Sequence, residues 1–262
     1  MKSFRAALWA EWLKARRSRV TLLTSAGFGL LPLVGGLFMI ILKDPEQARS
    51  LGLLGAKARL TAGTADWPAF LTFLTLGTSV AGPMLHAIIA AWVFGREFSD
   101  HTAKEFLALP TSRATVIAAK FVLLLLWTLL LSVLVFAFGL AIGWAVDIPG
   151  WSVELAVTSF AAVMGSCLLA LMLLPWVAFI ASAGRGYLPP IGWAFLTLAL
   201  AQIAAILGLG DWFPWAIPAL FSGSLGPRAD HLALHSYVAQ SITLLAGLSA
   251  TFAWWQTADQ SR

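Results

Sequence analysis

Six long stretches of this chain contain no Asp, Glu, Lys or Arg, and they constrain the fold more than any other feature. The stretches are residues 20–42, 67–95, 121–146, 155–184, 186–210 and 231–258. Each is longer than the roughly 20 residues that a helix needs to cross the hydrocarbon core of a bilayer. Their Leu and Ala runs show no alternation of period two, which disfavours lipid-facing strands. The sequence predicts an all-α polytopic membrane protein, a single domain over residues 1–262 with transmembrane helices at about 20–42, 68–95, 116–146, 153–183, 187–209 and 232–257.

The basic residues predict how these helices are oriented. In a six-span arrangement, 12 of the 17 Lys and Arg residues fall on one side. By the positive-inside rule that side is cytoplasmic, and both termini lie there. The same asymmetry explains the net charge of +5 without any nucleic-acid partner. We therefore expect a multi-pass protein of the cytoplasmic membrane.

The amino-terminal segment 3–18 is rich in both basic and apolar residues. Its pattern is typical of a helix lying in the headgroup plane, anchored by tryptophan and basic side chains. A charged juxtamembrane tail is the plainer alternative. The residues expected to act at the membrane interface are Phe4, Leu8, Trp9, Trp12, Lys14, Arg16 and Arg17.

A compact polar island, residues 95–120, interrupts the apolar sequence between the second and third spans. Thr102 and Glu105 match a capping box, and the Pro110–Ser112 stretch ends one short helix and caps the next span. An apolar centre with a polar rim suits docking of a partner, although a cap tucked against the headgroups fits too. The expected contact residues are Arg96, Glu97, Asp100, Thr102, Lys104, Glu105, Phe106, Leu107, Leu109 and Arg113.

Two segments are predicted on the opposite side of the membrane. Residues 147–151 form a tight turn, after which Ser152 and Glu154 suit a helix start. Residues 208–230 are broken by three prolines yet remain apolar, which favours an interfacial or re-entrant piece.

The uncharged stretches that form the cores of the spans contain no acidic, Lys or Arg residue, which disfavours a proton- or ion-coupled carrier. The 262 residues also contain no Walker A sequence, so any ATP-driven step needs another subunit. Three mid-span polar residues, His86, Ser166 and Gln202, are expected in the bundle interior, where they either line a pathway or bond each other. Gly139 and Gly143 permit close helix approach, inside one chain or between two.

An enzyme is the main alternative in another functional class. His231 and His235, beside Asp230, are spaced for a metal on a helix face, but no third ligand is evident and we assign no metal site. Ser222 and Ser224 invite an intramembrane hydrolase, yet neither lies in G-x-S-x-G and no base can be assigned. We therefore expect no catalytic residue in this chain. A non-transporting membrane anchor or sensor is a further alternative.

The whole layout resembles the permease subunits of type 2 ATP-binding-cassette exporters, especially the bacitracin and lantibiotic-immunity branch. The resemblance rests on the basic, Trp-bearing amino-terminal helix, on FGREFSDHTAKEFLALPTSRATVIAAK after the second span, and on DWFPWAIPAL before the sixth. It implies an elbow helix from Phe4 to Arg17 and a coupling helix at about Asp100 to Leu109 that docks into a separate ATPase subunit. It also implies short re-entrant helices over Trp212 to Phe221.

The resemblance further implies partners and a mechanism. Two permease chains, identical or different, would face each other, and two ATPase subunits would bind the ATP and Mg²⁺. Closure of the ATPases would drive alternating access through the coupling helices. A hydrophobic or amphipathic substrate, such as a peptide antibiotic, is expected; its identity, the direction of transport and the identity of the ATPase stay open.

Overall fold

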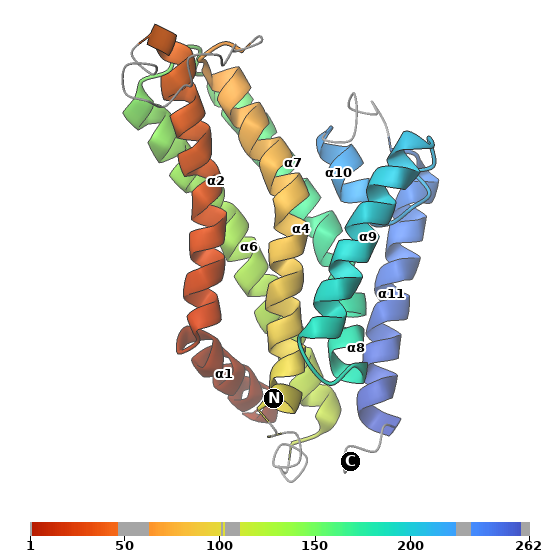
Figure 1. Ribbon diagram of the computed structural model, residues 1–262. Helices are drawn as coiled ribbons and strands as arrows, with labels where there is room; N and C mark the ends of the chain where they lie inside the picture. The colour runs from red at the N-terminus through yellow and green to blue at the C-terminus, as the bar shows by residue number, and fades with distance from the viewer. Residues whose placement is uncertain (1, 47–62, 101, 103–110, 224–231, 258–262) are drawn as a thin grey trace.

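The computed structural model describes residues 2–46, 63–100, 102, 111–223 and 232–257, and within them the regular structure is helical (Figure 1). The helices are α1 (Lys2–Arg16), α2 (Arg19–Lys43), α4 (Trp67–Ser99), α6 (Arg113–Val146), α7 (Val153–Leu171), α8 (Leu174–Ala183), α9 (Leu188–Ile206), α10 (Ile217–Ser222) and α11 (Leu234–Thr257). The predicted all-α class is confirmed for the described residues. The predicted coupling helix over residues 100–109 lies almost entirely outside them.

Among the described residues, five helical segments are long and apolar enough to cross a membrane. They are α2, α4, α6, α9 and the α7–α8 pair, residues 153–183. The predicted sixth span coincides with α11, which has 24 residues but is not among the five. By length and composition alone, five of the six predicted spans are supported, and the sixth, at α11, is not confirmed.

Polar residues set α11 apart, and they face a break in the neighbouring helix. The fourth predicted span divides at Met172 and Leu173, just before Pro175. At this break the Leu173 amide donates to the Ala170 carbonyl at 3.0 Å, so the Leu169 carbonyl is left without its usual helical donor. Gln240 of α11 donates its side-chain amide to the Leu169 carbonyl at 2.6 Å, and Thr251 donates to that of Pro175 at 3.1 Å. The polar residues of α11 therefore satisfy the broken span.

At one end of the bundle, which we call the tryptophan end, aromatic packing joins three helices. Trp67, at the start of α4, is fully buried against Trp144 and Trp151, with ring centroids 5.5 and 4.7 Å away. Gly143 of α6 lies against the Trp67 ring, where a Cβ atom would collide with it. Both glycines of the predicted pair serve packing between α6 and α4, since Gly139 similarly faces Leu74.

The predicted start of the fourth span at the tryptophan end is confirmed. The Ser152 side chain accepts a hydrogen bond from the Leu155 amide at 3.1 Å, so Ser152 is the N-cap and Glu154 lies in the first turn. Residues 207–216 make successive turns before the short helix α10, which packs against α7 and α4. As far as residue 223, the proline-rich segment forms turns and one short helix rather than a span.

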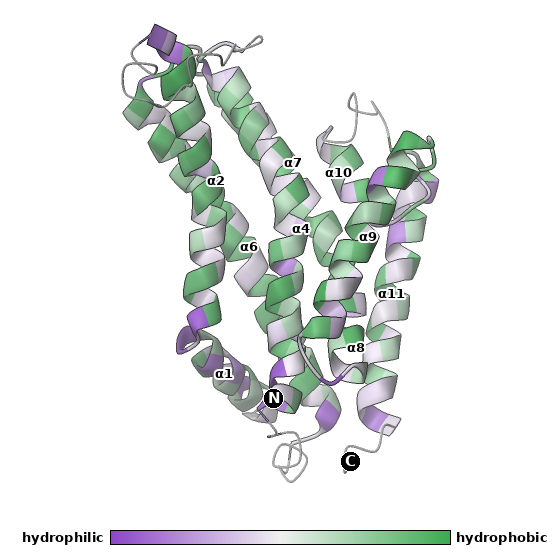
Figure 2. Ribbon diagram, in the orientation of Figure 1, coloured by the Kyte–Doolittle hydropathy of each residue, from purple (hydrophilic) through white to green (hydrophobic). Residues whose placement is uncertain are grey.

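The opposite end, which we call the charged end, holds α1, the end of α4 and the start of α6 (Figure 1). Hydrophilic residues concentrate in α1 and at these helix ends, whereas the long helices are largely hydrophobic (Figure 2). The predicted elbow, residues 3–18, appears as α1, a turn at Arg17, and Ser18, whose side chain caps α2 by accepting from the Val20 amide. α1 consequently lies across the charged end rather than continuing α2.

Candidate functional site

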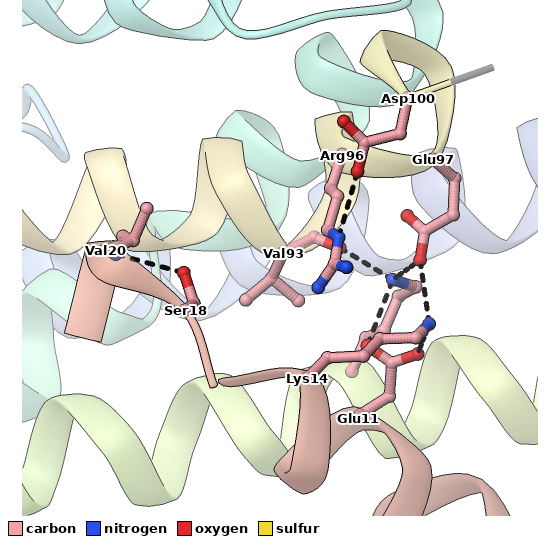
Figure 3. A network of polar contacts seen from close by, with 9 residues as sticks. Glu11, Lys14, Ser18, Val20, Val93, Arg96, Glu97 and Asp100 are labelled. Atoms are coloured by element: carbon pink, nitrogen blue, oxygen red, sulfur yellow. Dashed lines mark hydrogen bonds and ion pairs between the residues drawn. The ribbon is translucent and has the colours of Figure 1, made fainter. Parts of the chain in front are cut away.

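Four charged side chains meet where α1 crosses the end of α4 and the start of α6. The Lys120 ammonium donates to Glu97 Oε1 at 2.7 Å and to Glu11 Oε2 at 3.3 Å. The Lys14 ammonium donates to Glu11 Oε1 at 2.6 Å and to Glu97 Oε1 at 3.3 Å. Figure 3 shows Glu11 and Lys14 facing Glu97 across the junction. We call these four residues the charge cluster.

The charge cluster is buried and electrically balanced. Glu11 and Glu97 are each 3 % exposed and Lys120 is 1 % exposed. Lys120 also donates to the Val93 carbonyl at 2.6 Å. Since removing an ion from water costs several kcal/mol, such groups persist only when paired. Two carboxylates against two ammonium groups meet that requirement.

The cluster fixes both ends of the segment that joins α4 to α6. Glu97 lies two residues before the end of α4 and Lys120 lies in the second turn of α6, and each contacts Glu11 or Lys14 of α1. The amide of Thr102 donates to the Glu97 carbonyl at 2.9 Å, which closes α4. The predicted cap at Ser112 is confirmed, since its side chain accepts from the Thr115 amide. A movement of the joining segment would therefore displace α1 as well.

A pocket of ≈ 460 Å³ opens beside the cluster, between α1 and the two ends of the joining segment. Three small residues of α1, Ala6, Ala7 and Ala10, form one wall, while Glu97 and Thr102 contribute to the other. The second carboxylate oxygen of Glu97, Oε2, is buried without a hydrogen-bond partner. An unpaired carboxylate oxygen is costly in such a place, which increases the dependence of Glu97 on its two lysines.

A second, exposed ion pair lies next to the cluster. Arg96 Nε donates to Asp100 Oδ2 at 3.1 Å, and the guanidinium carbon is 5.1 Å from the centre of the Trp92 ring. Partial burial, together with the nearby charge of Asp100, raises the pKa of the Tyr187 phenol, while a hydrogen bond with Ser99 opposes that rise. The end of α4 thus carries an oriented guanidinium facing the turn before α9.

The structure sorts the predicted docking residues into three groups. Arg96, Asp100 and Thr102 line the ≈ 460 Å³ pocket, as Glu97 does. Arg113 instead donates to the Trp255 carbonyl at 3.0 Å and links α6 to the last turn of α11. The remainder fall outside the described residues: Lys104, Glu105, Phe106, Leu107 and Leu109.

Two expectations about the polar island need correction. Lys120 was expected at the edge of an exposed helical surface, yet it is enclosed by α1 and α4. Glu97 was expected to contact a partner across that surface, but its carboxylate is engaged by two lysines inside the chain. Both were misplaced for one reason: the sequence pattern does not show that α1 covers this end.

Sequence reasoning missed Glu11 altogether. It is the only acidic residue in α1, and it occupies the buried face together with Ala15. The available signal was the spacing of Glu11. It lies four residues before Ala15, which places both on the otherwise apolar side of a basic helix. Two tryptophans expected at the membrane interface are exposed on α1, Trp9 at 64 % and Trp12 at 41 %. Both tryptophans remain suited to the membrane interface.

The three candidate pathway residues do not converge. His86 of α4 is buried beside the Phe28 ring, at 5.3 Å between ring centroids, and Ser166 of α7 is also buried. The ring nitrogens of His86 and the hydroxyl of Ser166 have no hydrogen-bond partner. Gln202 of α9 was expected in the bundle interior, but it is exposed within this chain. It faces away from the helices that hold the other two.

The residues of the enzyme alternative give it no support. Ser222 donates to the Ala219 carbonyl at 2.9 Å, and His235 pairs with Asp211 at 3.1 Å while stacking on Trp212. Ser224, Asp230 and His231 lie outside the described residues. No group of three or more metal-ligating side chains occurs in the described part of the chain.

Comparison with known proteins agrees with this arrangement. A curated relative, the bacitracin transport permease protein BCRB of Bacillus licheniformis, is 27 % identical over 183 residues, which cover 68 % of this chain and 85 % of the relative. Residues 7–201, which hold the charge cluster and most of α1 and α9, match the family described as ABC-2 family transporter protein. The chain therefore belongs to the ABC-2 family of transporter membrane proteins.

Proposed function

We propose that this chain is the permease subunit of an ATP-driven exporter, and that the charge cluster relays movement of the joining segment into the membrane bundle. The observation that carries the proposal is the double attachment of α1 to both ends of that segment, through Glu97 and Lys120. A separate cassette ATPase, present in two copies, would bind ATP and Mg²⁺ and press on residues 100–109.

The chemistry of the cluster suits a relay. An ion pair in a low-dielectric setting resists separation, because each charge left alone pays its full desolvation cost. The helices it joins should therefore move together. The adjacent ≈ 460 Å³ pocket, which Arg96, Asp100 and Thr102 also line, gives an ATPase side chain a place to engage.

A second permease chain is part of the proposal. Gln202 projects from the exposed side of α9, where a lone amide would face lipid. Polar side chains within membrane helices normally find partners in the bundle. A second permease chain packed against α9 would supply such a partner for Gln202. Gln202 would then lie beside a translocation path shared by the two chains.

By analogy with the bacitracin transport permease, the proposed substrate is a hydrophobic or amphipathic molecule such as a peptide antibiotic. The uncharged interiors of the five apolar segments fit such a substrate better than an ion. The protein would be a multi-pass protein of the cytoplasmic membrane, with α1 and the end of α11 on the cytoplasmic side.

The decisive experiment uses a paired substitution that keeps the cluster balanced. Replacing Glu97→Gln and Lys120→Met together leaves the Glu11–Lys14 pair at 2.6 Å, while the ion pair between α4 and α6 is lost. The double variant should fold and still bind the ATPase. Its substrate-stimulated ATP hydrolysis and ATP-dependent transport into inverted vesicles should fall at least tenfold.

Arg113→Gln is the matched control, because it removes a charge from the same region without touching the cluster. It should retain most of the coupling. Undiminished stimulation in the double variant would show that the cluster is structural only. If the wild-type chain binds the ATPase but shows no ATP-dependent transport, the chain is instead an anchor or sensor.

A further inference from the structure

A second pocket at the charged end, of ≈ 500 Å³, shares Ala10, Lys14, Arg96 and Asp100 with the first. It is formed where α1 turns into α2, with the end of α4 and the residue before α9 closing it. Its wall includes three cations and one acid, together with two aromatic residues: Lys14, Arg17, Arg96, Asp100, Trp92 and Tyr187. The mechanism proposed above makes no use of it.

The two arginines of this pocket have unused donors. Asp100 takes one edge of the Arg96 guanidinium, and the Trp92 ring supports the group, so its terminal N–H groups are held in place. The exposed side chain of Arg17 makes no hydrogen bond or ion pair with the described residues. A planar guanidinium with free N–H groups binds phosphate oxygens through two parallel hydrogen bonds.

The charge of the pocket selects a monoanion. Lys14 is committed to Glu11 and Glu97, which leaves two arginines against Asp100. One net positive charge remains, matching the single negative charge of a phosphodiester. A phosphate dianion would be less well neutralised, and the negative charge of Asp100 would repel it more strongly.

The surroundings favour a lipid over a soluble phosphate. The neighbouring exposed side chains of α1 include Trp9 and Trp12, which suit the headgroup layer. The pocket lies at the end of the apolar helices, where basic sites between helices hold anionic headgroups. A phospholipid in the pocket would keep its acyl chains along the hydrophobic face of α2 (Figure 2).

We propose that this pocket, which we call the arginine pocket, binds the phosphodiester headgroup of an anionic phospholipid and fastens α1 to the membrane surface. The site is independent of the transported substrate. Tyr187 would add a phenol donor from the start of α9, so that the bound lipid would bridge α1, α4 and α9.

The test compares Arg17→Gln with Arg16→Gln in the purified full-length chain. The two substitutions remove the same charge one residue apart, and both side chains are exposed, but only Arg17 lines the pocket. The chain is placed in phosphatidylcholine nanodiscs with increasing phosphatidylglycerol. Bound phosphatidylglycerol is then counted by native mass spectrometry after release. Arg17→Gln should weaken binding about fivefold and Arg16→Gln less than twofold.

Arg96→Lys is a second variant, because it keeps the charge but loses the planar fork; it should also bind phosphatidylglycerol several-fold more weakly. Equal losses in Arg16→Gln and Arg17→Gln would overturn the proposal in favour of general surface attraction. Displacement of the lipid by millimolar inorganic phosphate or glycerol phosphate would identify a soluble anion instead. Unchanged lipid binding in Arg17→Gln with weakened ATPase binding would assign the pocket to a protein contact.

Discussion

The two ends of the bundle are fastened by different forces. At the tryptophan end, Trp67 packs against Trp144 and Trp151 with no ion pair among them. At the charged end, four ionised groups hold α1, α4 and α6 together. Aromatic packing weakens steeply as rings separate. The attraction within a buried ion pair decays slowly with distance, and full separation leaves unpaired buried charges at high cost, so its partners tend to move together. The charged end is therefore suited to transmit movement, and the tryptophan end to resist it.

The largest loss of stability is expected when one charge is removed from the charged end. Lys120→Met leaves Glu11 and Glu97 buried with Lys14 as their one remaining cation among the described residues, which should cost about 3–5 kcal/mol of stability. The thermal midpoint of the purified chain in detergent should fall accordingly. Because the Glu97→Gln, Lys120→Met pair restores the balance, it should recover most of the loss. A midpoint equal to that of the wild type in Lys120→Met would contradict the burial of the cluster.

Removal of the central ring should be the next largest effect. Trp67→Ala opens a cavity between α4, α6 and α7, at a cost of about 3 kcal/mol. Its consequence should differ in kind from that of the charged end. At a temperature where the variant is folded, substrate-stimulated ATP hydrolysis should be close to normal. Loss of coupling in this variant, without loss of fold, would break the proposed division between the two ends.

A smaller loss of stability is expected when the tryptophan end is overpacked. Gly143→Leu places a side chain where the Trp67 ring lies, and strain of this kind costs about 1–3 kcal/mol. Gly192→Leu on α9 is the matched control, since nothing lies within 4 Å of a Cβ atom there. The thermal midpoint should drop in the first variant only. Similar midpoints for the two would mean that α4 and α6 do not approach closely at Gly143.

The smallest effect is expected from the exposed ion pair at the tryptophan end. Lys43 donates to the carbonyls of Val146 and Asp147, and it lies 3.7 Å from the Asp147 carboxylate. Both side chains are exposed to solvent, so Lys43→Gln should change the free energy of unfolding by about 0.5 kcal/mol or less. A loss of several kcal/mol in a denaturant titration would show that this pair is protected in the assembled protein.

The helices themselves could be read from the sequence, because hydrocarbon thickness and backbone hydrogen bonding leave few choices. Ser112 and Ser152 marked helix starts correctly, since a capping oxygen acts on amides two or three residues away. The division of the fourth span just before Pro175 is also a local effect, because a proline in a helix interior removes a backbone hydrogen bond.

The charge cluster could not be found in this way. Glu11 and Lys120 are 109 residues apart, and neither has a local pattern that names the other. The prediction for Gln202 was wrong for a related reason. A polar residue in a span needs a partner away from lipid, but the sequence does not tell which helix or which chain provides it. Contacts between residues far apart in the sequence could be found only from the structure, whereas helix ends could be predicted from the sequence.

The contact between Gln240 and the Leu169 carbonyl has a consequence for how the protein is made. Synthesis proceeds from the amino terminus, so the broken span enters the membrane 71 residues before the amide that completes it. Until α11 is inserted, that carbonyl lacks its partner from this chain. A nascent chain stopped before residue 234 should thus be retained by insertion factors or degraded, and α11 acts as the closing step of biogenesis.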